Sequence, residues 1–188
     1  MSRLLAPLGL VMFITGALLA LQSGPASSSA LGWLPASSSP SVPAAVATTR
    51  TLPPIPLGYR IQIPRLGIDL AILEGDVARD TIALQTPEYY AFHFPGTAIP
   101  GTGANSYLYA HARSGMFISL WDARVGDVVW ISTPDGRTLR YVVSEIHPSV
   151  PPSEIAWAAA SPPERLTLQT STGPAPNDPR FIVVALPG

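Results

Sequence analysis

Three residues in the C-terminal half carry side chains that could cooperate in acyl chemistry: His111, Ser171 and Arg180. An imidazole can accept and return a proton near neutral pH, a hydroxyl can attack a carbonyl when a base removes its proton, and a guanidinium can stabilise an oxyanion. Each also has an ordinary structural explanation, as a surface histidine, a strand-end hydroxyl or an ion-paired arginine. Their order along the chain and their places at predicted strand ends favour a shared cleft.

Two predicted strands meet at the corner that carries Ser171 and Arg180. Residues 166–171 alternate apolar and polar side chains, which predicts a strand with one buried face. Residues 172–179 hold three prolines and a glycine, a composition typical of a loop. Arg180 then opens the apolar run 181–186, which predicts a second strand.

His111 is predicted at the tip of another strand, within residues 105–113. The preceding residues 89–103 are aromatic and then rich in glycine and proline, which predicts an ordered loop. His93 lies in that loop, and with His147 it is interpreted as structural because neither has a partner in any motif.

These residues resemble the sortases, of the class D or E type. The sortase signature is a Thr-Leu-x-Thr-Cys strand end followed, one loop later, by an arginine that begins the last strand, and the chain has Thr-Leu-Gln-Thr-Ser at 167–171 and then Arg180. The run 94–101 resembles the sortase approach to the catalytic histidine, although Ala110 replaces the usual glycine before it. A Phe-x-x-Leu segment at 117–120 and a Gly-Asp pair at 126–127 also match.

The resemblance implies a reaction and a set of roles. A sortase cysteine attacks the Thr-Gly bond of a Leu-Pro-x-Thr-Gly type sorting signal, the histidine is the general acid and base, and the arginine steadies the oxyanion or the substrate. The matching residues are Ser171, His111 and Arg180. By the same resemblance the expected substrate contacts are Thr170, Ile155, Trp157 and Asn177, and the partners are a surface-protein sorting signal and an amine or cell-wall acceptor.

Serine at position 171 departs from the sortase pattern, and the chain has no cysteine anywhere. A neighbouring cation can drive a thiol to the thiolate, but a serine hydroxyl needs a neutral histidine as base, ideally oriented by a carboxylate. Asp122 is the nearest acid after His111, and no motif aims it at the imidazole. We therefore expect weak or no transpeptidation.

Three alternatives stay open. Ser171 could be a working nucleophile with His111 as its base, and a carboxylate within hydrogen-bond reach of His111 would favour this reading. The domain could be a non-enzymatic surface scaffold or adhesion module. Ser171 could also be an introduced replacement for a native cysteine, which the retained apolar N-terminus disfavours.

The composition excludes several function classes. All eleven cationic side chains are arginine and the net charge is −1, so a basic nucleic-acid footprint and lysine chemistry are both absent. Three histidines without cysteine or suitable carboxylate spacing predict no metal site, and no cofactor is expected.

The N-terminal third predicts export of the domain. After residues 1–3, the uncharged run 4–21 is long enough for a single-pass transmembrane anchor, with Arg3 on the cytoplasmic side. A cleaved signal peptide is the competing reading. Residues 22–58 are rich in Ser, Ala and Pro, which predicts a linker that holds the domain outside the cell.

Residues 59–188 are predicted to form an all-β domain, a closed sortase-like barrel of seven to eight strands with one or two short helices. One hairpin is especially clear, with residues 128–132 and 139–146 flanking an Asp-Gly turn at 135–136.

Overall fold

The structure, a computed structural model, describes residues 52–82, 84–160 and 162–188. The predicted segments 1–3 and 4–21 and most of the predicted linker lie outside these ranges. Within the described ranges, no helix has the length and apolar character needed to cross a bilayer.

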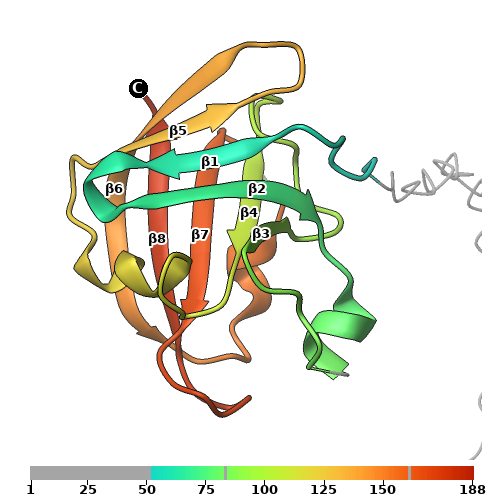
Figure 1. Cartoon of the computed structure of the whole chain (residues 1–188), viewed down its shortest axis with the longest axis vertical. Helices are drawn as coiled ribbons and strands as arrows, with labels where there is room; N and C mark the ends of the chain where they lie inside the picture. Colours follow the sequence, from blue (N-terminus) through green and yellow to red (C-terminus); the bar gives the residue numbers. More distant parts are fainter. Residues whose placement is uncertain (1–51, 83, 161) are drawn as a thin grey trace, which may run out of the picture. The chain divides into compact units, whose positions relative to one another are not determined.

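Eight strands form one closed barrel, which confirms the predicted fold (Figure 1). Around the barrel the order is β1-β2-β3-β4-β7-β8-β6-β5. The strands are β1 (Arg60–Ile63), β2 (Ile68–Glu74), β3 (Tyr90–His93), β4 (Asn105–Tyr109), β5 (Val128–Ser132), β6 (Thr138–Val150), β7 (Arg165–Ser171) and β8 (Arg180–Pro187).

Helical structure in the described ranges is limited to short segments between strands. They are η1 (Pro64–Leu66), η2 (Ala78–Ile82), η3 (Phe117–Asp122) and η4 (Ile155–Ala158). The Phe-x-x-Leu segment at 117–120 lies in η3, which buries Phe117 and Leu120.

The predicted hairpin is confirmed, because β5 and β6 pair antiparallel from Val128↔Val142 to Ser132↔Thr138. The prediction of a loop over residues 89–103 is wrong for its first part, where Tyr90–His93 forms β3. This strand pairs parallel with β2 and antiparallel with β4. A four-residue strand carries too weak a periodic signal to be recognised, and its pairing with two neighbours stabilises it in the fold.

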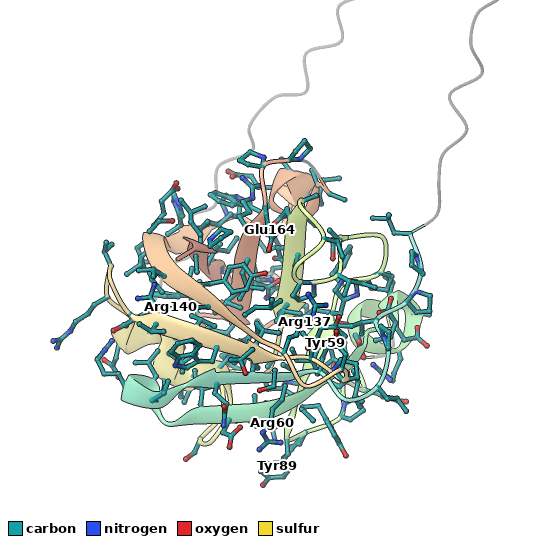
Figure 2. The ribbon with its side chains drawn as sticks, turned by 90° about the horizontal axis from the view of Figure 1, so that it is seen from above. Tyr59, Arg60, Tyr89, Arg137, Arg140 and Glu164 are labelled. Carbon is teal, nitrogen blue, oxygen red and sulfur yellow. The ribbon has the colours of Figure 1, made fainter. Side chains whose placement is uncertain are left out.

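Alternating strand residues fill the barrel interior, as the side chains in Figure 2 show. Fully buried members include Ile61, Ile72, Leu108, Ile131, Leu168 and Val183. The core also includes Ile55, which is 5% exposed and precedes the predicted domain start at Tyr59. A smaller cluster of Val150, Ile182 and Val184 lies on the outer face of the sheet, with Trp157 packed against it.

Strand pairing brings the predicted site residues to one end of the barrel. Strands β4 and β7 run parallel and side by side, with Tyr109 opposite Gln169, so the chain after both strands emerges at the same end (Figure 1). Strands β7 and β8 pair antiparallel, and Ser171 is the register partner of Arg180. His111, Ser171 and Arg180 therefore approach one another because of the sheet order.

Candidate functional site

A cavity of about 1210 Å³ opens at this end of the barrel, and its lining includes His111, Ser171 and Arg180. The three residues that the sequence singled out thus share one cleft. Ile155 and Trp157 from η4 also line it, as do the aromatic side chains of Phe94, Tyr107, Tyr109 and Trp121. The wall is mainly apolar, with charged groups at a few points.

The Ser171 hydroxyl is held by its own loop. Its Oγ donates to the carbonyl oxygen of Gly173 at 2.5 Å. It accepts from Arg180 Nη1 at 3.3 Å and from Gly173 N at 3.4 Å. A hydroxyl has one proton, and here that proton is directed to Gly173. No hydrogen bond joins Ser171 to His111 in the described part of the chain.

Arg180 braces the loop between β7 and β8. Besides Ser171, it donates from Nη2 to the carbonyl of Pro176 at 2.9 Å. The same loop is closed by Thr172 N donating to Pro179 O at 3.0 Å, and by Ala175 N donating to Asp178 Oδ2 at 2.6 Å. The guanidinium therefore lies beside Ser171 as a fixed positive charge.

His111 is oriented by a backbone carbonyl. Its Nε2 lies 2.8 Å from the carbonyl oxygen of Thr86. A carbonyl oxygen only accepts, so Nε2 carries a proton and the lone pair of the neutral ring lies on Nδ1. No carboxylate pairs with His111 among the described residues. The backbone carbonyl of Asp122, the acid considered from the sequence, accepts a hydrogen bond from Arg65 Nη2 at 2.6 Å.

The four predicted substrate contacts occupy different places. Ile155 is 81% exposed and Trp157 is partly buried, and both line the cavity. Thr170 is buried beneath it, where its hydroxyl donates to the carbonyl of Ala110 at 3.0 Å. Asn177 is exposed on the β7–β8 loop, outside the cavity lining. The fold therefore gathers Ile155 and Trp157 with the three predicted catalytic residues.

Asn105 holds η4 in place, a role that sequence reasoning missed. Its side chain is fully buried, and Nδ2 donates to the carbonyls of Trp157 at 2.9 Å and Ala159 at 3.0 Å. Its Oδ1 accepts from the Thr167 hydroxyl at 2.7 Å. A polar residue at the start of an otherwise apolar strand was the available signal, since a buried amide requires partners.

A second missed group lies on the groove floor. The Tyr107 hydroxyl donates to Gln169 Oε1 at 2.8 Å across the β4–β7 pair. Burial raises the pKa of Tyr107, so the phenol stays protonated and acts as the donor. Both residues line the cavity, and the Tyr107 ring meets the Phe94 ring edge to face, with centroids 5.7 Å apart.

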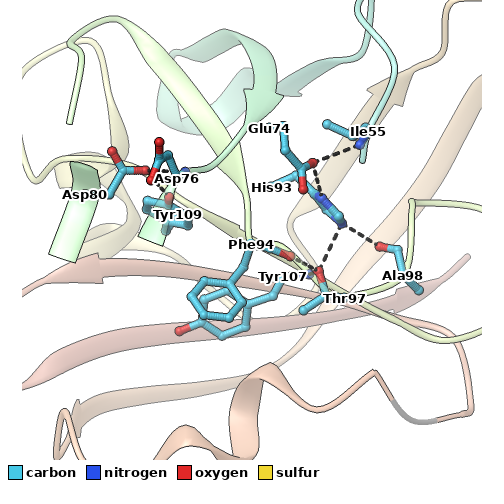
Figure 3. A network of polar contacts seen from close by, with 10 residues as sticks. All are labelled: Ile55, Glu74, Asp76, Asp80, His93, Phe94, Thr97, Ala98, Tyr107 and Tyr109. Carbon is cyan, nitrogen blue, oxygen red and sulfur yellow. Dashed lines mark hydrogen bonds and ion pairs between the residues drawn. The ribbon is translucent and has the colours of Figure 1, made fainter. Parts of the chain in front are cut away.

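Asp80 is the third missed residue, and it lines the cavity beside Tyr109. Its carboxylate accepts from the Tyr109 hydroxyl and from Asp76 N at 3.1 Å (Figure 3). It also accepts from Arg79 Nη2 at 2.8 Å. Burial alone would raise the pKa of Asp80, but the hydrogen bonds from Arg79 and Tyr109 outweigh it and hold the pKa below its usual value. The carboxylate is therefore ionised at neutral pH.

His93 has the carboxylate that His111 lacks. Its Nδ1 lies 2.8 Å from Glu74 Oε2, and its Nε2 lies 3.0 Å from both Thr97 Oγ1 and the Ala98 carbonyl (Figure 3). The interpretation of His93 as structural agrees with its full burial and its place outside the cavity lining, although no sequence motif indicated these partners. No group of three or more potential metal ligands occurs in the described ranges.

Comparison with known proteins identifies the fold. The model of the sortase domain matches residues 61–187. A search of the curated proteins found no match. Among solved structures, sortase A from Corynebacterium diphtheriae is 31% identical with a TM-score of 0.58, over 71% of this chain and 61% of that one. The chain thus spans less than two thirds of that protein.

Two further structures are similar over a larger share of their own length. Sortase C-1 from Actinomyces oris is 30% identical, with a TM-score of 0.57, over 71% of this chain and 76% of that one. The Clostridium perfringens sortase D5 transpeptidase is 25% identical, with a TM-score of 0.58, over 71% of this chain and 82% of that one. The similarity extends to several sortase classes at nearly the same level. With a family match over most of the barrel, the chain belongs to the sortase family.

Proposed function

We propose that this protein recognises a sorting-signal type peptide on a sortase scaffold and performs little or no transpeptidation. Ser171 stands where the family carries its cysteine nucleophile, His111 stands at the acid and base position, and Arg180 stands beside the reacting centre. The support is their common cleft and the family match. The Clostridium perfringens relative is a transpeptidase. The Leu-Pro-x-Thr-Gly type peptide is the ligand class implied by the resemblance of the motif residues to the sortases.

The observation that carries the proposal is the direction of the Ser171 proton. It points to Gly173 O at 2.5 Å rather than to an imidazole nitrogen. To attack a carbonyl, the hydroxyl would have to leave Gly173 and Arg180 and transfer its proton to His111. The resulting imidazolium would have a neutral carbonyl, not a carboxylate, on Nε2. Removing one member of a nucleophile and base pair lowers kcat by roughly six orders of magnitude.

The cavity suits an extended peptide with apolar side chains. Exposed Leu84, Trp121 and Ile155 lie on its lining and offer contact area at separate points. The side-chain amide of Gln169 faces the same cavity, with its oxygen held by Tyr107. An apolar wall with a few placed polar groups is the usual character of a ligand site.

The test compares the natural protein with Ser171→Cys and Ser171→Ala. The full chain in detergent is incubated with a labelled Leu-Pro-x-Thr-Gly peptide, with and without an amine acceptor, and binding is measured alongside turnover. We expect all three proteins to bind the peptide and only Ser171→Cys to turn it over. Turnover by the natural protein that Ser171→Ala abolishes would establish serine as the nucleophile and contradict the proposal. Failure of all three to bind would contradict the ligand class.

We also propose that residues 4–21 anchor the protein in the cell membrane with the domain outside. The support is the uncharged run and the position of Arg3. Protease added to intact cells should remove the domain and leave a membrane-bound fragment. A protected domain would contradict the topology, and a secreted domain that begins after residue 21 would favour a cleaved signal peptide.

A further inference from the structure

The ring of His111 is held by a loop that belongs to a different part of the barrel. The Thr86 loop, residues 84–89, lies between η2 and β3, and its Thr86 carbonyl accepts from His111 Nε2. Because this contact determines which ring nitrogen carries the lone pair, whatever holds the loop also determines the chemistry that His111 can offer.

The loop has a backbone conformation that its neighbours must maintain. Leu84 and Tyr89, on either side of Thr86, have φ of 55° and 65°, which is uncommon for residues other than glycine. Both side chains are largely exposed, and Tyr89 points away from the body of the molecule in Figure 2. Side-chain burial therefore does not explain the conformation, which requires other contacts to maintain it.

Several of those contacts lead to Asp80. Gln85 N donates to the Arg79 carbonyl at 2.9 Å, and Thr86 Oγ1 lies 3.5 Å from the Asp80 carbonyl. The Asp80 side chain is only 1% exposed and accepts from Arg79, Asp76 N and the Tyr109 hydroxyl. Arg79 also lies over the Phe92 ring, 5.0 Å from its centroid. The turn that precedes the loop is thus fixed to the barrel through one buried carboxylate.

Tyr109 and His111 are two residues apart at the end of β4, so an extended chain directs both side chains to the same side. Ala110 N still donates to the Gln169 carbonyl at 3.2 Å, which continues the pairing with β7 beyond the strand end. The same edge therefore makes two contacts, Tyr109 with Asp80 and His111 with Thr86. Asp80, Thr86, Tyr109 and His111 all line the cavity.

We propose that Asp80 is a positioning residue for His111: by anchoring the turn before the Thr86 loop to Tyr109, it keeps the Thr86 carbonyl on Nε2 and leaves the lone pair of the neutral ring on Nδ1. Asp80 does not touch His111 and acts through the loop. Asp80 has this role whether or not Ser171 reacts.

The experiment uses the full chain in detergent, labelled with ¹⁵N in histidine, without peptide. Long-range ¹H–¹⁵N spectra assign the protonated ring nitrogen, and the exchange of the Nε2 proton with water measures how firmly Thr86 holds it. The His111 signal is identified by its loss in His111→Gln. For the neutral ring of the natural protein we expect a proton on Nε2, an unprotonated Nδ1 and slow exchange of the Nε2 proton.

Asp80→Asn should accelerate exchange of the Nε2 proton roughly tenfold, about the effect of losing one net hydrogen bond, and should mix the two neutral tautomers. Tyr109→Phe, which keeps the ring but removes the hydroxyl, should act in the same direction and serves if Asp80→Asn does not fold. Glu88→Gln is the matched control, because it neutralises a carboxylate on the same loop that pairs with Arg113.

Three results would overturn the inference. One is a proton on Nδ1 of the natural protein, and another is unchanged exchange in folded Asp80→Asn and Tyr109→Phe. The third is an equal effect of Glu88→Gln, which would assign the role to the exposed ion pair. None depends on peptide binding, so failure here is distinct from failure of the proposed function.

Discussion

His93 and His111 lie at the ends of neighbouring strands, but the protein gives them opposite surroundings. His93 is fully buried and has a partner on each nitrogen, with Glu74 on one side and Thr97 on the other. The set of carboxylate, imidazole and hydroxyl resembles a hydrolase triad in composition but has no access to a substrate. His111 faces the groove with one neutral partner, Thr86 O.

The contrast between His93 and His111 shows that a carboxylate, an imidazole and a hydroxyl in contact do not make a catalytic site unless a substrate can reach them. Glu74 Oε2 also accepts a hydrogen bond from the backbone N of Ile55 at 2.8 Å, so the pair fastens the segment before β1 to the barrel. Buried polar groups of this kind are costly unless every partner is present. His111 is half-buried on the cavity lining and has no such structural role.

Replacing each histidine with alanine is the most direct test of whether His93 and His111 contribute differently to stability. His93→Ala should lower the free energy of unfolding by about 3 kcal/mol, because it leaves a cavity and removes the partners of Glu74 and Thr97. His111→Ala should lower it by no more than about 1 kcal/mol, since one hydrogen bond at a half-buried site is lost. Urea unfolding of both variants measures this, and equal losses would contradict the contrast.

Asn105, like His93, is a buried polar residue, but its hydrogen bonds hold η4 at the edge of the cavity. Asn105→Ala removes two donors to the backbone around η4, so we expect a loss of stability of about 2 kcal/mol and weaker peptide binding as η4 is released. Asn177→Ala, at an exposed amide, is the control and should change stability by less than about 0.5 kcal/mol. Unchanged peptide affinity in Asn105→Ala would show that η4 is held by other contacts.

Substitutions of Trp157 and Ile155 should distinguish the contribution of η4 to stability from its contribution to peptide binding. Trp157 packs against Ile182 and Val184 and lies 4.5 Å, ring centroid to centroid, from His147. Trp157→Ala should therefore cost about 1.5 kcal/mol of stability. Ile155→Ala should leave stability unchanged but weaken peptide binding roughly fivefold, through the lost apolar contact. Calorimetric binding and thermal unfolding distinguish the two, and destabilisation by Ile155→Ala would contradict its assignment.

Asp127 is a second carboxylate with a cationic partner, and here the partner is Arg65. Hydrogen bonds from Arg65 lower the pKa of Asp127 in the folded state despite its burial. A lowered folded pKa adds stability above the unfolded value of about 3.9, and that stability is lost as pH falls through the folded pKa. Asp127→Asn should thus be less stable than the natural protein at pH 7 and converge with it as the pH falls below the folded pKa of Asp127. A constant difference in the midpoint of urea unfolding across that range would contradict this.

Sequence alone determined much of the barrel and the identity of its principal groups. The alternation in residues 166–171, the Asp-Gly turn at 135–136 and the loop composition of 172–179 are local signals, and each corresponds to an observed strand, hairpin or loop. His111, Ser171 and Arg180 could be selected because the residues around them resemble the sortase motifs, and the fold places all three on one cavity lining. The short strand β3 could not be predicted from the sequence, because the strands with which it pairs are distant along the chain.

Tertiary structure alone decided what each polar group does. The partners of His93, His111 and Asp80 come from segments up to 29 residues away in the sequence, as Tyr109 does for Asp80. Hydrogen bonds depend on distances of about 3 Å and on donor direction, which no periodicity encodes. For this reason the sequence could name a histidine and a serine for one cleft, while only the folded chain directed the serine proton to Gly173 and the imidazole to Thr86.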